Sequence, residues 1–325
     1  MRRAFTLIEL LVVITIIGML AAMSLGALYT AKESARVAKT QSTITKLDRI
    51  IQARYEEFAS RRLPIANRRI PPKAMAELKL QVLREIIRME MPDRLTDITY
   101  PRDHAVADPP KSLNDITETF AVSVSWIDQV GREHGAKETI QRPALNRRYF
   151  QKIYDHSPSA EDGTLRISGE FSPAELLYLI VTSDSEAREQ FQENEIGDND
   201  EDGFFEFVDG WGRPIMFLRW APAYRSGMQA QDAENDHDPL DPRRVDQGAC
   251  RLVPLIYSGG PDKKFGLRTD AATGSGAGWV FQFGVNDTAV GRLYTHGNAA
   301  DIGKALTDGE EADSHHDNIT NHGGF

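Results

Sequence analysis

The chain has very little cysteine: Cys250 is the one cysteine among its 325 residues. No disulfide can therefore form within the chain, and an exported domain would need packing, a metal ion or assembly for its stability. The sequence also lacks a zinc motif, a nucleotide motif and a nucleophile with a plausible neighbouring base, so an enzyme has no support. Its 48 acidic residues outnumber its 38 basic ones, which argues against a nucleic-acid partner.

The N-terminal residues combine a short basic start with a long apolar run. Arg2 and Arg3 precede the run, and Glu9 is the one charged residue from Phe5 to Leu28. An α-helix over these 24 residues would be about 36 Å long, enough to span the ~30 Å hydrocarbon core of a membrane. The basic start favours a cytoplasmic N-terminus and export of everything that follows the helix.

A conventional secretory signal also has a basic start and an apolar stretch, and the small residues from Ala21 to Ala27 could supply its cleavage site. Glu9 argues against this alternative. A carboxylate inside a membrane costs about 2.5 to 3.5 kcal/mol on insertion scales, so an acid at this depth usually has a functional partner. We therefore expect Glu9 to have a functional role beyond that of a residue in a membrane anchor.

The segment from Arg3 to Ala22, with Phe-Thr-Leu-Ile-Glu at positions 5 to 9, closely resembles the N-terminal signature of type IV pilins and type II secretion pseudopilins. The resemblance implies that residues 1–4 are a leader, that prepilin peptidase cuts between Ala4 and Phe5, and that Phe5 becomes N-methylated. It also implies that Glu9 pairs with an N-terminal amine during assembly. A buried acid and a buried ammonium are costly alone and become tolerable when assembly brings them together.

The same resemblance implies partners and a location. The expected partners are other pilin-like subunits in a homo- or heteropolymer, the prepilin peptidase and methyltransferase, and the inner-membrane platform of a secretion or pilus system. The protein would cross the inner (cytoplasmic) membrane once, with a short cytoplasmic N-terminus and an exported C-terminal domain. It would then enter a periplasmic or cell-surface filament.

An amphipathic helix is expected to continue directly from the transmembrane half at residues 5–28. Its apolar stripe recurs at spacings of three and four, at Ile44, Leu47, Ile51, Tyr55 and Phe58. Residues 29–62 should therefore form the second half of one long helix, which ends before Pro64 because the residue preceding a proline disfavours helical backbone. A membrane helix followed by a separate coiled coil is the alternative, but the heptad pattern is short.

The rest of the chain divides into an insertion and a sheet region. Residues 63–170 are expected to form a mostly helical insertion, and Ser172-Pro-Ala-Glu175 has the pattern of a capping box that opens a helix. In residues 171–325, the turn from Asp209 to Pro214 and a strand ending at Ser258 resemble the sheet of the type II secretion major pseudopilin. We expect a pilin-like α+β fold, with the long N-terminal helix packed on a C-terminal antiparallel sheet.

An acidic run extends from Ser183 to Gly210, where eleven acids accompany one base. Within it, Asp198-Asn-Asp-Glu-Asp-Gly203 reproduces the D-x-D-x-D-G pattern of a calcium loop, in which alternate acids wrap one ion around a turn that glycine permits. A solvated acidic loop is the alternative. The predicted calcium ligands are Asp198, Asp200, Asp202, the carbonyl of Phe204, Glu206 and Asp209. The candidates for a second, weaker calcium site are Asp262, Asp270 and Asp317.

The family resemblance implies a structural protein rather than an enzyme. The predicted function is polymerisation into a type II secretion pseudopilus or a type IV pilus-like filament, with an exported domain that calcium stabilises. The alternative is a membrane-tethered minor pilin, or a binding or cargo protein, that uses prepilin-type processing without forming the bulk of a filament. The large insertion favours this alternative over a close-packed major subunit.

Overall fold

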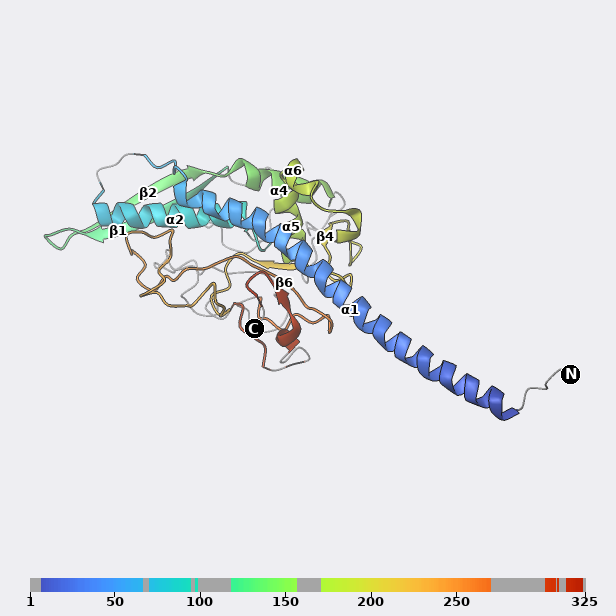
Figure 1. Ribbon diagram of the computed structural model, residues 1–325. Helices are drawn as coiled ribbons and strands as arrows, with labels where there is room; N and C mark the ends of the chain where they lie inside the picture. The colour runs from blue at the N-terminus through green and yellow to red at the C-terminus, as the bar shows by residue number, and fades with distance from the viewer. Residues whose placement is uncertain are drawn as a thin grey trace.

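The structure is a computed structural model that describes residues 7–66, 70–94, 97–98, 118–156, 171–269, 302–307, 309 and 314–323. Its longest element is helix α1, which spans Leu7–Ser60. The first part of α1, residues 7–32, is exposed throughout and projects from the rest of the molecule (Figure 1). We call this part the stalk, and we call the described residues outside α1 the head. The predicted long N-terminal helix is therefore confirmed.

The second half of α1 lies across the head because it carries the apolar stripe. Ile44, Leu47, Ile51 and Phe58 are buried, and Tyr55 packs against the same core. Within the described part of the chain, α1 alone is long and apolar enough to cross a membrane, by length and composition. None of its most apolar window is buried, which distinguishes it from the core helix of a globular domain.

The α-helices whose bounds lie within the described part of the head are α2 (Pro72–Glu90), α4 (Ala144–His156), α5 (Ser172–Thr182) and the single turn α6 (Ser185–Arg188). Two short 3-10 helices occupy Glu193–Glu195 and Ser314–Asp317. Helix α2 lies within the insertion, and Pro72 suits its first position because a proline there has no amide to leave unsatisfied.

A β-hairpin joins these helices in the insertion, which we had expected to be mostly helical. Strands β1 (Thr119–Ile127) and β2 (Glu133–Gln141) pair antiparallel along their whole length, from Thr119 with Gln141 to Ile127 with Glu133. Phe120, Val122 and Val124 of β1 are buried at alternate positions, as expected for a strand with one face on the core, and Ala121 between them is buried as well. The hairpin lies at the end of the molecule opposite to the stalk (Figure 1).

The C-terminal sheet has three antiparallel strands in the order β5-β6-β7, at Met216–Leu218, Leu255–Ser258 and Ile319–Thr320. Its two faces enter different apolar clusters. Phe217 and Ile256 join the main core with α1, α2, α4 and α5, whereas Leu218 and Tyr257 join a smaller cluster on the other side. The arrangement of long helix and antiparallel sheet confirms the predicted pilin-like α+β fold.

A buried network of charged side chains stabilises the joint between α2 and the sheet. Arg88 of α2 donates to Asp97 at 3.1 Å, and Arg219, which follows β5, donates to the same carboxylate at 2.8 Å. Burial opposes ionisation of Asp97, but the Arg219 and Arg88 guanidinium groups outweigh it and lower the pKa of Asp97 to about 2. Arg88 also pairs with Glu85, and Arg219 also pairs with Asp93, so removing Asp97 would leave this buried network one negative charge short.

Candidate functional site

The N-terminal end of the stalk carries the first predicted functional group. Glu9 lies in the first turn of α1 and is exposed, and the apolar side chains that follow it along the stalk are exposed as well. Ala4 and Phe5, the predicted cleavage residues, lie outside the described residues. The stalk therefore offers a lateral apolar surface with one carboxylate near its start.

The head binds α1 just beyond the stalk, through a segment that precedes the acidic loop. Lys39 donates to the carbonyl of Asn194 at 2.8 Å. Glu195 accepts from the hydroxyl of Thr43 at 2.6 Å and from the ammonium of Lys46 at 2.7 Å. The side chain of Glu195 is almost fully buried, so this ion pair is shielded from water more than a surface pair would be.

A second segment, directly after the acidic loop, binds the same stretch of α1. The amide of Gly210 donates to the Thr40 hydroxyl, and the indole of Trp211 donates to Glu33, both at 2.9 Å. Gly210 lies so close to α1 that an added Cβ would be 2.7 Å from the Cα of Arg36. The loop between these two segments is thus fixed to α1 at both ends.

The acidic loop itself connects two short paired strands. Strands β3 (Ile196–Gly197) and β4 (Glu206–Phe207) run antiparallel, and the residues between them form the turn. Gly203 has a φ of 94°, which a glycine adopts without strain, and its amide donates to Asp198 at 3.2 Å. The amide of Phe204 donates to Asp202 at 2.8 Å. The glycine of the D-x-D-x-D-G pattern therefore occupies the sharp bend that the pattern predicts.

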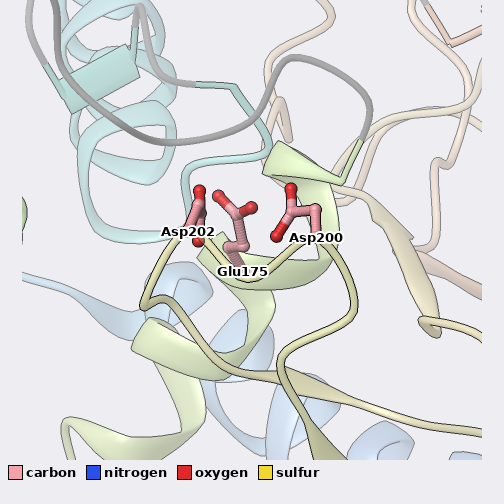
Figure 2. A group of neighbouring side chains, drawn as sticks. All are labelled: Glu175, Asp200 and Asp202. Carbon is pink, nitrogen blue, oxygen red and sulfur yellow. The ribbon is translucent and has the colours of Figure 1, made fainter.

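Three carboxylates meet at this loop, and one of them comes from a different element. Asp200 and Asp202 of the loop and Glu175 of α5 each place an oxygen within 4.8 Å of the other two. Figure 2 shows the three side chains next to one another, with Glu175 of the helix between Asp202 and Asp200 of the loop. Glu175 was not among the predicted ligands. Its sequence context predicts a capping box, but α5 forms no side-chain cap bond and the Ser172 hydroxyl has no hydrogen-bond partner.

Glu206 and the loop aspartates contribute further oxygens that the protein does not satisfy. Glu206 is fully buried; its Oε2 accepts from the Asn199 amide at 3.3 Å, while its Oε1 has no hydrogen-bond partner. Oδ1 of Asp198 and both carboxylate oxygens of Asp200 are also buried without one. Burial, followed by the charges of Asp200, Asp198 and Asp202, raises the pKa of Glu206 to about 8. Such a group of acids is suited to a hard cation that prefers oxygen ligands.

The structure does not bring Asp209, the last predicted ligand, into this group. Its Oδ1 accepts from the amides of Trp211 and Arg213 at 2.8 and 2.9 Å, and its Oδ2 accepts from the Ser258 hydroxyl at 2.6 Å. Both oxygens are therefore engaged in fixing the turn between β4 and β5 to strand β6. Asp209 therefore has a structural role, and it is not among the three carboxylates that the structure brings together, so its part in binding an ion stays a prediction.

The predicted second site is only partly assembled. The amide of Asp262 donates to Asp317 at 3.2 Å, so the structure brings these two residues together. The Asp262 carboxylate accepts from the amide of Lys264 at 2.8 Å, which is the geometry of a turn. Asp270 lies outside the described residues. Within the described part of the chain, no group of three close carboxylate, imidazole or thiolate ligands includes Asp262 or Asp317.

Comparison with known proteins identifies the N-terminus. Residues 1–25 match the family described as the prokaryotic N-terminal methylation motif. With the long apolar helix that follows, this match shows a type IV pilin-like prepilin signature. No curated protein and no solved structure matches the chain. The motif supports a pilin-like protein that prepilin peptidase processes, and the long apolar N-terminal helix fits a membrane anchor.

Proposed function

We propose that this protein is a structural subunit of a type II secretion pseudopilus or a type IV pilus-like filament. The observation that carries the proposal is the N-terminal methylation motif on a helix whose apolar half is entirely exposed. Outside a membrane, such a surface needs lateral partners, and parallel copies of the same helix supply them. The subunit crosses the inner membrane once, with its N-terminus in the cytoplasm and its head exported.

Glu9 acts in this proposal as the assembly carboxylate, which pairs with the N-terminal amine of a neighbouring subunit. Its position in the first turn of an exposed apolar helix supports that role, because an isolated carboxylate in hydrocarbon is costly. The mature chain should begin with N-methylated Phe5, which N-terminal mass analysis detects. A chain that starts at Met1 or near Leu28 would exclude prepilin processing. The variant Glu9→Leu should be cleaved normally and should fail to form filaments.

The head, in our proposal, binds calcium in the loop between β3 and β4. The unsatisfied oxygens of Asp198, Asp200 and Glu206 support this assignment, together with the bend at Gly203. A bound cation would attract these acids and so offset their mutual repulsion. A ligand that binds only the folded head stabilises the folded state by mass action. This stabilisation takes the place of a disulfide, which the single cysteine cannot form.

The calcium proposal is tested by thermal unfolding of the full chain in detergent micelles, with calcium and with a chelator. Calcium should raise the midpoint for the wild type, and Asp200→Asn should lose most of that rise. Glu201→Gln is the matched control, because Glu201 is an exposed acid of the same loop at a position that the calcium pattern does not use. An equal midpoint in calcium and in chelator for the wild type would leave only a solvated acidic loop.

The alternative of a minor or cargo-binding pilin is favoured by the β1–β2 hairpin. Ile127 and Val130 at its end are 72% and 76% exposed, although both are apolar. The hairpin lies at the end of the head away from the stalk, where a tip subunit would meet other molecules. Imaging of filaments with a tagged chain separates the alternatives: label along the whole filament indicates a major subunit, and label only at one end indicates a minor one.

A further inference from the structure

We propose that Glu175 of α5 is the ligand that closes the calcium site, in place of the acid at the twelfth position of the loop. This inference rests on the calcium binding proposed above and names a ligand that the loop pattern does not contain. In a calcium loop the twelfth residue supplies a bidentate carboxylate from the chain that leaves the loop. Here that residue is Asp209, and both of its oxygens are engaged elsewhere.

The position of Glu175 fits the missing ligand. It comes from the helix and lies between Asp202 and Asp200 (Figure 2), with one oxygen within 4.8 Å of oxygens of both aspartates. Carboxylate oxygens that share one calcium ion, each about 2.3 to 2.6 Å from it, lie within about 5 Å of one another. The group therefore has the dimensions of a shared coordination sphere before any side chain moves.

Helix α5 holds Glu175 rigidly in this position. Leu176, Leu177 and Ile180 anchor the helix in the main core. Tyr178 lies on the same face as Glu175, three residues later, and its ring packs against Phe205 and Phe207 at 5.9 and 5.3 Å between centroids. The helix face that carries Glu175 is thus packed directly on the acidic loop, and Glu175 itself is fully buried.

A second observation points to a ligand at this place independently of the acid cluster. Glu206 is fully buried on strand β4, and its Oε1 has no hydrogen-bond partner. Buried polar atoms in proteins are nearly always satisfied, so an unsatisfied carboxylate oxygen beside three aspartates indicates a missing cation. Calcium takes six to eight oxygen ligands. Glu175, Asp200 and Asp202 lie within 4.8 Å of one another, and in our proposal the remaining ligands, Asp198, Glu206 and the carbonyl of Phe204, move inward when the ion binds.

The proposal explains how a loop site can stabilise the whole head. An ion held by a loop alone would order only that loop. An ion held also by Glu175 joins the loop to α5, and the loop ends at Glu195 and Gly210 are bonded to α1. Calcium would therefore connect the core helix α5 to the segment that binds α1.

The decisive experiment compares Glu175→Gln with Glu201→Gln in the full chain in detergent micelles. Calcium affinity should fall at least about tenfold in Glu175→Gln and stay close to the wild-type value in Glu201→Gln. Terbium serves as a luminescent probe, because its lifetimes in H₂O and D₂O count the water molecules bound to the ion. Glu175→Gln should show more bound water than the wild type, since Gln cannot bind the ion through two oxygens.

Thermal unfolding adds a readout that a purely structural role of Glu175 would not produce. In chelator, Glu175→Gln should melt at or above the wild-type temperature, because it removes one buried acid from a group of like charges. In calcium, it should melt below the wild type. A merely structural Glu175 would lower both midpoints. If Glu175→Gln does not fold, Glu175→Asp keeps the charge and should show the weaker affinity and the additional water.

The outcomes separate this inference from the proposals on which it rests. Wild-type affinity and an unchanged water count in Glu175→Gln, with calcium binding lost in Asp200→Asn, would overturn the role of Glu175 and leave the loop site standing. A wild type that binds neither calcium nor terbium would overturn both. The filament proposal depends on neither result, because it is tested through Phe5 and Glu9. Equal affinity for magnesium would contradict the assignment to calcium, because magnesium demands near-ideal octahedral geometry and usually keeps several of its water molecules, which a site of mostly protein ligands displaces.

Discussion

Replacement of Gly210 by alanine tests whether the head and α1 are as closely fitted as the structure indicates. The backbone of Gly210 does not have a positive φ, so alanine causes no backbone strain there. The added Cβ would, however, lie 2.7 Å from the Cα and 2.8 Å from the carbonyl carbon of Arg36. Both atoms belong to the α1 backbone and cannot rotate away. The head must therefore move from α1 by about 0.5 Å, enough to forfeit a quarter or more of the local packing energy.

The cost follows from what this movement disturbs. Overpacking of this kind typically destabilises by about 1 to 3 kcal/mol. The hydrogen bonds from Gly210 to Thr40 and from Trp211 to Glu33 are both 2.9 Å long, and each contributes about 1 kcal/mol, more for the charged acceptor. We expect Gly210→Ala to lower the unfolding free energy by about 2 to 4 kcal/mol, a large part of the 5 to 15 kcal/mol of a typical domain.

Urea unfolding of the full chain in detergent, followed by tryptophan fluorescence, measures this loss. Gly227→Ala is the matched control, because a Cβ at Gly227 would meet no atom within 4 Å. The control should be neutral or slightly more stable, since alanine reduces the entropy of the unfolded chain. If Gly210→Ala unfolds within about 0.5 kcal/mol of the control, the contact between the head and α1 is looser than described and the reasoning fails.

Further predictions concern charged groups in the head. Asp97→Asn should cost about 3 kcal/mol at pH 7, because Arg88 and Arg219 stay buried without their shared carboxylate. The lowered pKa of Asp97 means that its ionised form stabilises the folded state at pH values above the ordinary carboxyl pKa, and this stabilisation is lost as the pH falls. The difference in unfolding free energy between wild type and Asp97→Asn should therefore shrink between about pH 4 and pH 2 in urea titrations. Lys46→Met should cost about 1 to 2 kcal/mol in the same assay, and adding Glu195→Gln should recover part of it; a double variant that is simply additive would contradict the ion pair.

The parts of the fold that could be predicted are those with local signals. The apolar run and the stripe through Ile44 and Leu47 predicted one continuous helix, because periodicity and length depend only on neighbouring residues. The β1–β2 hairpin had a similar signal, with alternation from Phe120 to Trp126 and a turn at Gly131 whose φ is 82°, but the surrounding prolines and charges obscured it.

The candidate site shows where local signals end. The spacing of Asp198, Asp200 and Asp202 predicted the loop and its bend at Gly203, since these residues belong to one turn. Asp209 accepts a hydrogen bond from Ser258, which lies on another strand, so the loop pattern could not predict this contact. Glu175 comes from a different helix, and its Ser-Pro-Ala-Glu context offered a local explanation that the structure does not support.

The buried ion pairs, like the contact of Glu175 with the loop, could not be predicted from the sequence. Arg84 of α2 is almost fully buried between Asp238 and Asp246, at 2.8 and 2.9 Å. Its partners lie more than 150 residues further along the chain, in a segment without helix or strand signals. Composition gives the number of charges but not their pairing, because desolvation and tertiary contact decide which of them are buried.

The exposed stalk also determines what a stability measurement on this protein means. A solubilised subunit unfolds from a state in which residues 7–32 contact detergent, so its unfolding free energy describes the head and the α1 half bound to it. The apolar area of the stalk is removed from water only by lipid or by other chains, and that contribution depends on subunit concentration through mass action. The subunit and the polymer thus have two separate stabilities, and a substitution in the stalk can abolish the second without any change in the first.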